Sequence, residues 1–316
     1  MVPRSVLMFT ACLALALLVF AAYLSNIASL TPVEDVDAAP MDTPTPQPTP
    51  AILLGAGDIT ICGSDTDDQT AYTLDWLIQA YPQAQIFTVG DNVQIMGEAH
   101  EYANCFHPTW GQFKERIHPS PGNHDWFTEE GKAYFEYFGE AAGPAGLGYY
   151  SYDHGSWRMI SLNSNCEQRD CSAESAQMQW LRAELLANQN RCTMVYWHHP
   201  RWDSGTVPID PAADVFWRTA AENGADIVVN GHDHHYERFT PIDAQGNPDS
   251  QGTRPFIIGT GGAWLFELGK PLPITEARDN TTYGIMVFYL HPEQYEWAFV
   301  PVDGGKFWDT GEGECH

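Results

Sequence analysis

The sequence predicts an α/β domain built in layers, and three observations support this fold class. Short apolar runs rich in β-branched residues recur along the chain and have the length and composition of buried strands. Stretches in which apolar residues have helical spacing fill the gaps between these runs. The alternation continues without an internal repeat, as expected for a layered α/β domain rather than a repeat array.

The expected elements follow from these patterns in chain order. Strands are predicted at Ala51–Leu54, Ile86–Val89, Met159–Leu162, Thr193–Trp197, Ile227–Val229 and Phe256–Ile258. Helices are predicted at Gln69–Ala80, Glu98–Phe113, Ala173–Leu186 and Ala212–Asn223. Near the C-terminus, Gly284–Leu290 and Tyr295–Pro301 are expected to form a final antiparallel pair.

The first 50 residues are expected to lie outside this domain. Val6–Leu24 is apolar except for Thr10 and Cys12, which fits a signal-peptide core or a membrane anchor, and its length slightly favours the uncleaved anchor. Thr31–Pro50 contains six prolines and forms an extended linker. The predicted layout is therefore a signal or anchor in residues 1–30, a linker in 31–50 and one catalytic domain in 51–316.

Composition and cysteine content indicate an exported protein with no affinity for nucleic acid. Fifteen Lys and Arg against 41 Asp and Glu give a net charge of -26, which repels polyanions and leaves no basic patch for a membrane surface. Membrane contact is expected only through residues 6–24, so the protein is extracytoplasmic, either secreted or anchored. The sequence does not indicate an oligomeric state.

Disulfides are expected in the exported domain. Beyond Cys12 there is an even set of six cysteines: Cys62, Cys105, Cys166, Cys171, Cys192 and Cys315. Six cysteines allow about 15 connectivities. The pairing that the sequence favours most is Cys166 with Cys171, which would close a small loop.

Polar residues able to bind metal follow a strand or strand-like run at five places. At four of them a glycine comes immediately before, which permits the tight turn and close backbone approach of a crowded site. The C-terminal edge of such a sheet is where ligands usually bind. The five groups are Asp58, Asp91-Asn92, Asn123-His124-Asp125, His198-His199 and His232-Asp233-His234-His235.

This donor set predicts a metal centre with more than one ion. Carboxylates, an amide oxygen and imidazoles suit Zn, Mn or Fe. There are too many donors for one tetrahedral ion and too many histidines for a calcium cage. Two ions bridged by one carboxylate would use all of them.

The ordered motifs resemble those of the calcineurin-like metallophosphoesterase superfamily. Gly231-His232-Asp233-His234-His235-Tyr236-Glu237-Arg238 resembles its purple acid phosphatase branch, and Tyr196–Pro200 and Asn104–Gly111 resemble bacterial secreted relatives of that branch. The resemblance implies a layered α-β-β-α sandwich with two mixed sheets and metals at the C-terminal strand ends. It also implies a small phosphorylated substrate.

The resemblance assigns roles to individual residues. Asp58 and His234 would bind the first metal, Asp91 would bridge, and Asn123, His198 and His232 would bind the second. His124 would approach the phosphate or leaving group, with Asp125 orienting its ring. His199 either reaches the substrate or only supports a ligand. His235 is expected to point away from the metals, and Glu237 and Arg238 to form a structural ion pair.

Two departures from the family pattern concern the first metal. The histidine that most members place two residues after the first aspartate is Thr60 here. The tyrosine that purple acid phosphatases place three residues after the bridging aspartate is Gln94. Gln94, Thr60 or water would have to replace this ligand. Without a phenolate, ferric iron is less favoured and the first metal is expected to bind more weakly.

Three functions remain open at this stage. The favoured one is an exported phosphatase that hydrolyses phosphate monoesters through a hydroxide bridging two metal ions. A phosphodiesterase or nucleotidase would use the same site with different pocket walls, expected at Asn163–Cys171, Arg201–Val207 and Trp264–Phe266. A cell-surface binding module that has lost catalysis would explain Thr60 and Gln94, but it would have no need of His124.

Overall fold

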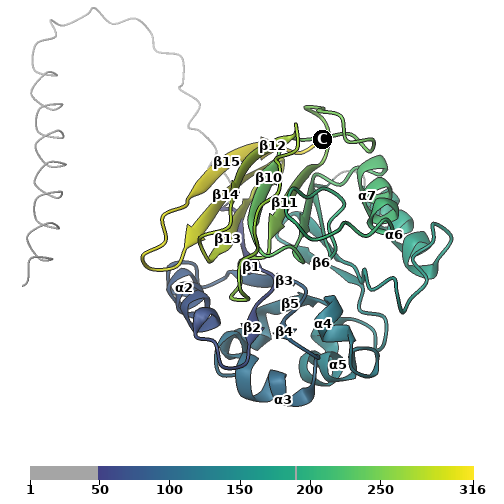
Figure 1. The fold of residues 1–316 in the computed structure, drawn as a ribbon. Coiled ribbons are helices and arrows are strands. Elements are labelled where there is room, and N and C mark those ends of the chain that lie inside the picture. The colour runs from purple at the N-terminus through teal and green to yellow at the C-terminus, as the bar shows by residue number, and fades with distance from the viewer. Residues whose placement is uncertain (1–48, 189–190) are drawn as a thin grey trace, which may run out of the picture. The chain divides into compact units, whose positions relative to one another are not determined.

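Two mixed β-sheets form the centre of the protein in the computed structural model, which describes residues 49–188 and 191–316 (Figure 1). The first sheet has the order β15 (Asp309–Glu314), β14 (Gln294–Pro301), β13 (Gly284–Leu290), β1 (Ala51–Ala56), β3 (Gln85–Val89), β5 (Ile117–Ser120). The second has the order β12 (Thr275–Asp279), β10 (Tyr236–Phe239), β11 (Arg254–Ile258), β9 (Ile227–Asn230), β8 (Thr193–Tyr196), β7 (Trp157–Ser161), β6 (Tyr150–His154).

Three hydrophobic cores separate four layers, because successive side chains of a strand point to opposite faces of its sheet. Leu53 packs in the core between the two sheets, whereas its neighbour Leu54 packs in the core under the helices of the first sheet. Likewise Met194 faces the core between the sheets, and Val195 faces the helices of the second sheet. The predicted α-β-β-α arrangement with two mixed sheets is confirmed.

Helices cover the outer face of each sheet (Figure 1). The first sheet packs against α2 (Thr66–Ala80) and α5 (Lys132–Phe138), and the second packs against α6 (Ala176–Ala187) and α7 (Ala213–Glu222). A short helix, α4 (Asn123–Trp126), begins at Asn123, which is one of the predicted metal ligands. Two further short strands, β2 (Thr60–Ile61) and β4 (Val93–Gln94), pair in parallel beside it.

The prediction of one continuous helix over Glu98–Phe113 is wrong. The segment consists of α3 (Ala99–Glu101), a π-helical turn η1 (Tyr102–Phe106) and a 3₁₀ helix η2 (Trp110–Arg116). Pro108 lies between the last two, and the following Thr109 leaves helical geometry with φ -105° and ψ -96°. A proline cannot donate a helical hydrogen bond, so a break at this point is the physical outcome.

Three disulfides cross-link the domain. Cys166 bonds Cys171, which confirms the favoured pairing, and the others join Cys62 to Cys105 and Cys192 to Cys315. Among the residues that the structure describes, no helix combines the length and the apolar composition needed to cross a bilayer. The apolar run Val6–Leu24 lies outside those residues.

Candidate metal centre

The predicted ligands converge where the two sheets meet. Asp58, Asp91 and Asn123 follow β1, β3 and β5 of the first sheet, and His198 and His232 follow β8 and β9 of the second. Backbone hydrogen bonds connect the loops, since Asp58 N–H donates to the Gly90 carbonyl and Gly231 N–H to the His198 carbonyl. Residues far apart in sequence are thus fixed in one crowded site.

The Asp58 side of the site brings together two acceptor atoms. His234 Nδ1–H donates to the Trp264 carbonyl at 2.8 Å, so His234 Nε2 presents a lone pair. That atom lies 3.2 Å from Asp58 Oδ1, which is buried and has no hydrogen-bond partner. Two acceptors this close repel each other unless a cation lies between them, so a metal ion fits here.

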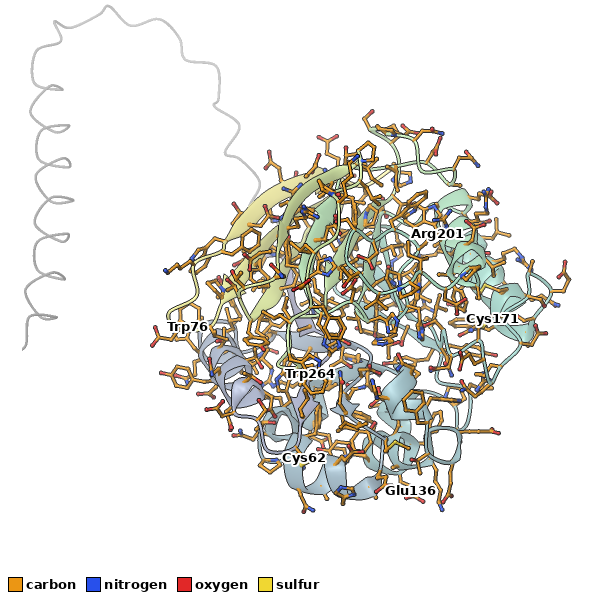
Figure 2. The ribbon with its side chains drawn as sticks, in the orientation of Figure 1. Cys62, Trp76, Glu136, Cys171, Arg201 and Trp264 are labelled. Carbon is orange, nitrogen blue, oxygen red and sulfur yellow. A yellow bond between two sulfur atoms is a disulfide. The ribbon has the colours of Figure 1, made fainter. Side chains whose placement is uncertain are left out.

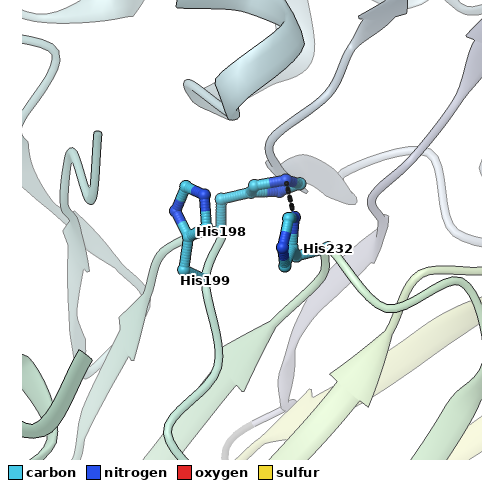
Figure 3. A group of neighbouring side chains, drawn as sticks. All are labelled: His198, His199 and His232. Carbon is cyan, nitrogen blue, oxygen red and sulfur yellow. Dashed lines mark hydrogen bonds between the residues drawn. The ribbon is translucent and has the colours of Figure 1, made fainter. Parts of the chain in front are cut away.

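The Asp91 side repeats this arrangement. His198 Nδ1–H donates to the Val89 carbonyl at 2.8 Å, which turns Nε2 toward Asp91 Oδ2 at 3.3 Å and Asn123 Oδ1 at 3.1 Å. His232 Nδ1 is 3.2 Å from the same Nε2 (Figure 3). Ligand atoms of Asp91, Asn123 and His232 therefore all lie within 3.3 Å of His198 Nε2, and this donor set also fits a metal ion.

The pKa values of His198 and His232 indicate that the carboxylates of the site stabilise one positive charge. Burial alone would lower the pKa of His198, but the Asp91 and Asp58 carboxylates raise it to about 9. Burial and the neighbouring His198 instead lower the pKa of His232 to about 4. The protein alone thus places a proton between His198 and Asp91, at a position that a bound cation would take.

Close packing and backbone strain hold the ligands in place. Asp58, Asp91 and His232 adopt φ values of 58°, 49° and 71°, a left-handed conformation that side chains other than glycine rarely take. A Cβ at Gly122 would lie 2.1 Å from Asp91 Oδ1. Glycine is therefore required here because the backbone passes against the Asp91 carboxylate. Strain of this kind is typical of functional sites.

His124 lies at the mouth of the centre, but Asp125 does not orient it. His124 Nδ1–H donates to the Ile95 carbonyl at 2.6 Å, and Nε2 faces Asp91 Oδ2 at 3.8 Å. Asp125 is fully buried and accepts hydrogen bonds from the Asn92 and Gly122 backbone and from Tyr102. The expectation for Asp125 was wrong because its carboxylate braces the loop that carries Asp91.

His199 lies on the exposed side of the second metal position. Its ring lies beside that of His232, with the centroids 4.5 Å apart (Figure 3). Its Nδ1 is 2.8 Å from the Ser164 hydroxyl. Burial and the adjacent His198 lower its pKa well below the ordinary value, so the ring is neutral. The sequence left open whether His199 reaches the substrate or only supports a ligand, and its position beside a groove is the one that contact with a substrate requires.

The residues after His234 behave as predicted in one case and not in the other. His235 points away from the centre toward the buried Asp203, Asp233 and Glu237. Glu237 and Arg238 do not pair, because neighbouring residues of β10 point to opposite faces. Arg238 instead pairs with Asp309 and Glu276.

Gln94 lies at the site and Thr60 does not. The buried Gln94 amide approaches His234 Nε2 at 3.4 Å, and rotation of this amide offers either its nitrogen or its oxygen. The Thr60 hydroxyl donates to Asp67 at 3.1 Å, away from the ligands. Of the replacements that the sequence left open, Gln94 is therefore positioned to act and Thr60 is not.

Two grooves open from the centre. The first, which we call the Trp264 groove, has a volume of about 350 Å³ and is lined by Ile95, His124, Val207, Trp264 and Phe266 together with ligands. The second, the His199 groove, has a volume of about 400 Å³ and is lined by His199, Phe127, Ile209 and residues of the Cys166–Cys171 loop. All three predicted walls contribute, whereas no sequence pattern pointed to Ile95, Phe127 or Ile209.

Comparison with known proteins places this geometry in a family context. A family model described as calcineurin-like phosphoesterase matches residues 46–236, more than half of the chain. Purple acid phosphatase 22 of Arabidopsis thaliana is 26% identical over 212 residues, which cover 57% of this chain and 47% of the relative. The chain thus spans about half the length of this curated relative.

Solved structures share the fold. The purple acid phosphatase PPD1 from yellow lupin (Lupinus luteus) seeds superposes with a TM-score of 0.68 at 18% identity, covering 83% of this chain and 53% of that one. GAP50, an anchor in the inner membrane complex of Plasmodium, superposes with a TM-score of 0.65 at 13% identity, covering 85% of this chain and 90% of that one.

Proposed function

Because the chain belongs to the calcineurin-like phosphoesterase family, in its purple acid phosphatase-like branch, we propose that it is an exported, metal-dependent hydrolase of phosphate monoesters. The observation that carries the proposal is the set of imidazole nitrogens directed at carboxylate and amide oxygens. Export is supported by the three disulfides, which form and persist in oxidising compartments.

Two ions, Zn, Mn or Fe, fit the donors. Asp58, His234 and Gln94 would hold the first, Asn123, His198 and His232 the second, and Asp91 would contact both. When bound, such ions activate water and stabilise charge on the phosphoryl oxygens. In its doubly protonated form, His124 would donate the Nε2 proton to the leaving oxygen and keep the Nδ1 proton, which is held by the Ile95 carbonyl. His199 would contact a phosphoryl oxygen from the opposite groove.

The proposal is tested by measuring metal content and hydrolysis together. The purified full-length protein is analysed for bound metal and then assayed with an aryl phosphate monoester and a diester. Two metals per chain with faster monoester turnover is the expected result. Faster diester turnover would replace the proposal by a phosphodiesterase, for which the two grooves offer a place for both organic arms of the substrate.

The third alternative, a binding module without catalysis, draws support from Gln94. An amide is a weaker donor than imidazole or phenolate, so one position holds its metal less tightly. One metal or none, without turnover of either ester, would favour this alternative and overturn the proposed hydrolase.

A further inference from the structure

The surroundings of the metal centre are unusually apolar for a protein of such high charge. Nine large hydrophobic side chains are exposed in the described residues, and four of them line the two grooves. These four are Ile95, Phe127, Ile209 and Trp264. Exposed apolar surface that gathers at a polar site marks a place where an apolar group is bound.

The Trp264 groove has the size and walls for an aromatic group. Ile95, Val207, Trp264 and Phe266 form its sides, and Trp264 is 51% exposed, which leaves part of the indole available for contact with a bound ring. Figure 2 shows Trp264 well inside the outline of the domain, whereas Trp76 lies at its edge. A dry cavity of about 150 Å³ holds benzene, so about 350 Å³ admits one or two fused rings.

This wall is held rigidly by a metal ligand. The Trp264 carbonyl accepts the His234 Nδ1–H, and the Phe266 N–H donates to the His234 carbonyl at 3.0 Å. The Phe266 ring stacks on the His234 imidazole with centroids 4.0 Å apart, and Asn280 donates to the Phe266 carbonyl at 2.7 Å. The groove therefore exists before a substrate arrives, which limits the entropy lost on binding.

His124 links this groove to the chemistry. It lines the Trp264 groove, and its Nε2 faces the centre while Nδ1 is held by the Ile95 carbonyl. An ester whose leaving oxygen meets Nε2 would therefore direct its organic group between Ile95 and Trp264.

Charge restricts which organic groups are accepted. In the part of the chain that the structure describes, no lysine or arginine lines either groove, and Glu167 and Asp210 line the second one. A further phosphate or carboxylate on the substrate would lose water without gaining a cationic partner. The net charge of -26 adds repulsion at longer range.

Resting on the proposed monoesterase function, we propose that the enzyme selects phosphate monoesters of neutral aromatic alcohols. The ring lies in the Trp264 groove, and substrates with additional anionic groups are discriminated against. Trp264 is the main specificity-determining residue.

The test uses the metal-loaded full chain with phenyl phosphate, 1-naphthyl phosphate and 4-carboxyphenyl phosphate. We expect the lowest KM for the naphthyl ester. The kcat/KM for the carboxylated ester should be about tenfold below that for phenyl phosphate, and added salt should reduce this difference because it screens the repulsion. W264A should raise the naphthyl KM about tenfold with unchanged metal content. I95K should improve the carboxylated ester selectively.

W308A is the matched control, because Trp308 is similarly exposed at 60% but lines neither groove. It should leave all three esters unchanged. Equal use of the charged and neutral esters, or an unchanged naphthyl KM in W264A, would overturn the selectivity while the monoesterase function stands. Failure to hydrolyse any of the three esters would overturn both.

Discussion

Asp91 and His124 lie against each other but have different tasks, and substitutions should separate them. The Asp91 carboxylate lies between the two candidate metal positions, since its ligand atom is within 4.8 Å of those of Asp58 and His198, whereas His124 only borders them. We expect D91N to lose metal from both positions and all activity. H124A should keep its metal and lose about 10²–10⁴-fold in kcat, the usual contribution of a positioned proton donor. Metal analysis beside steady-state kinetics makes the comparison.

A retained activity in H124A would mean that the leaving group departs without help from this histidine. Loss of metal in H124A would instead make it a ligand. D125N provides a further comparison, since the buried Asp125 carboxylate accepts backbone hydrogen bonds. It should lower stability as well as activity, because an amide cannot accept all of these bonds.

Gln94 determines which metal is lost first. Its neutral amide near His234 stands where relatives have a stronger imidazole or phenolate donor, so mild chelation should remove the Asp58–His234 metal before the other. Q94Y should tighten that metal and, with ferric iron, produce a visible tyrosinate absorption. Titration with a chelator while absorbance and activity are followed measures both effects. If Q94A matches the parent protein in metal content and rate, position 94 does not contact the metal.

At the scale of elements, Glu237 joins β10 to two neighbouring segments. Its carboxylate accepts hydrogen bonds from the Ser204 N–H and hydroxyl and from the Thr275 hydroxyl at the start of β12. In E237Q, an NH₂ group replaces one carboxylate oxygen and would face the N–H or hydroxyl donors from which that oxygen accepts. We therefore expect a loss of about 1–3 kcal/mol in the free energy of unfolding, measured by denaturant titration.

E312Q supplies the control, because Glu312 lies exposed on the edge strand β15. Its effect should stay within about 0.5 kcal/mol. An equally small effect of E237Q would show that this buried network adds little to the free energy of unfolding.

The elements that the sequence predicted well are those with one dominant signal. The runs at Ile86–Val89 and Ile227–Val229 are buried on both faces, and continuous apolar composition identifies such strands. Several strands that escaped prediction, among them Thr275–Asp279 and Asp309–Glu314, lie at the edges of the sheets, whereas the short β10, in which charged residues interrupt the apolar pattern, lies inside the second sheet. Edge strands carry charged and small residues, which leave no apolar pattern to read.

The candidate site divides in the same way. Each candidate ligand lies within a few residues of the end of its strand, so the positions of the strand ends were enough to predict that Asp58, Asp91 and His198 come together. The partners of Asp125 and Arg238 depended on segments remote in sequence, such as Tyr102 and Asp309. Contacts of this kind arise only when the layers pack, and no local pattern contains them.

For the whole molecule, the disulfides differ in the length of chain that they close. Cys192–Cys315 spans 123 residues and Cys166–Cys171 spans 5. In the chain-entropy account, the long closure is worth about 5 kcal/mol and the short one about 2 kcal/mol. C192A/C315A should therefore lower the free energy of unfolding more than C166A/C171A does, in metal-free denaturant titrations.

The short disulfide should show itself in binding instead. Cys166 lines the His199 groove, so C166A/C171A is expected to raise KM while leaving most of the stability intact. Equal stability losses in the two double variants would argue against the chain-entropy explanation for this protein.

Of the strands that the structure describes, β1 is synthesised first and β13 among the last. The two are nevertheless neighbours in the first sheet, where Leu53 pairs with Phe288. During translation β1 therefore has β3 on one side and an open edge on the other. Pairings between such distant segments form slowly, since a long loop must close first. The Asp58 carbonyl, just after β1, accepts a hydrogen bond from the Ala263 N–H, so its final position also depends on a segment made late in synthesis. We therefore expect the candidate metal centre to assemble only after these later segments of the chain have left the ribosome.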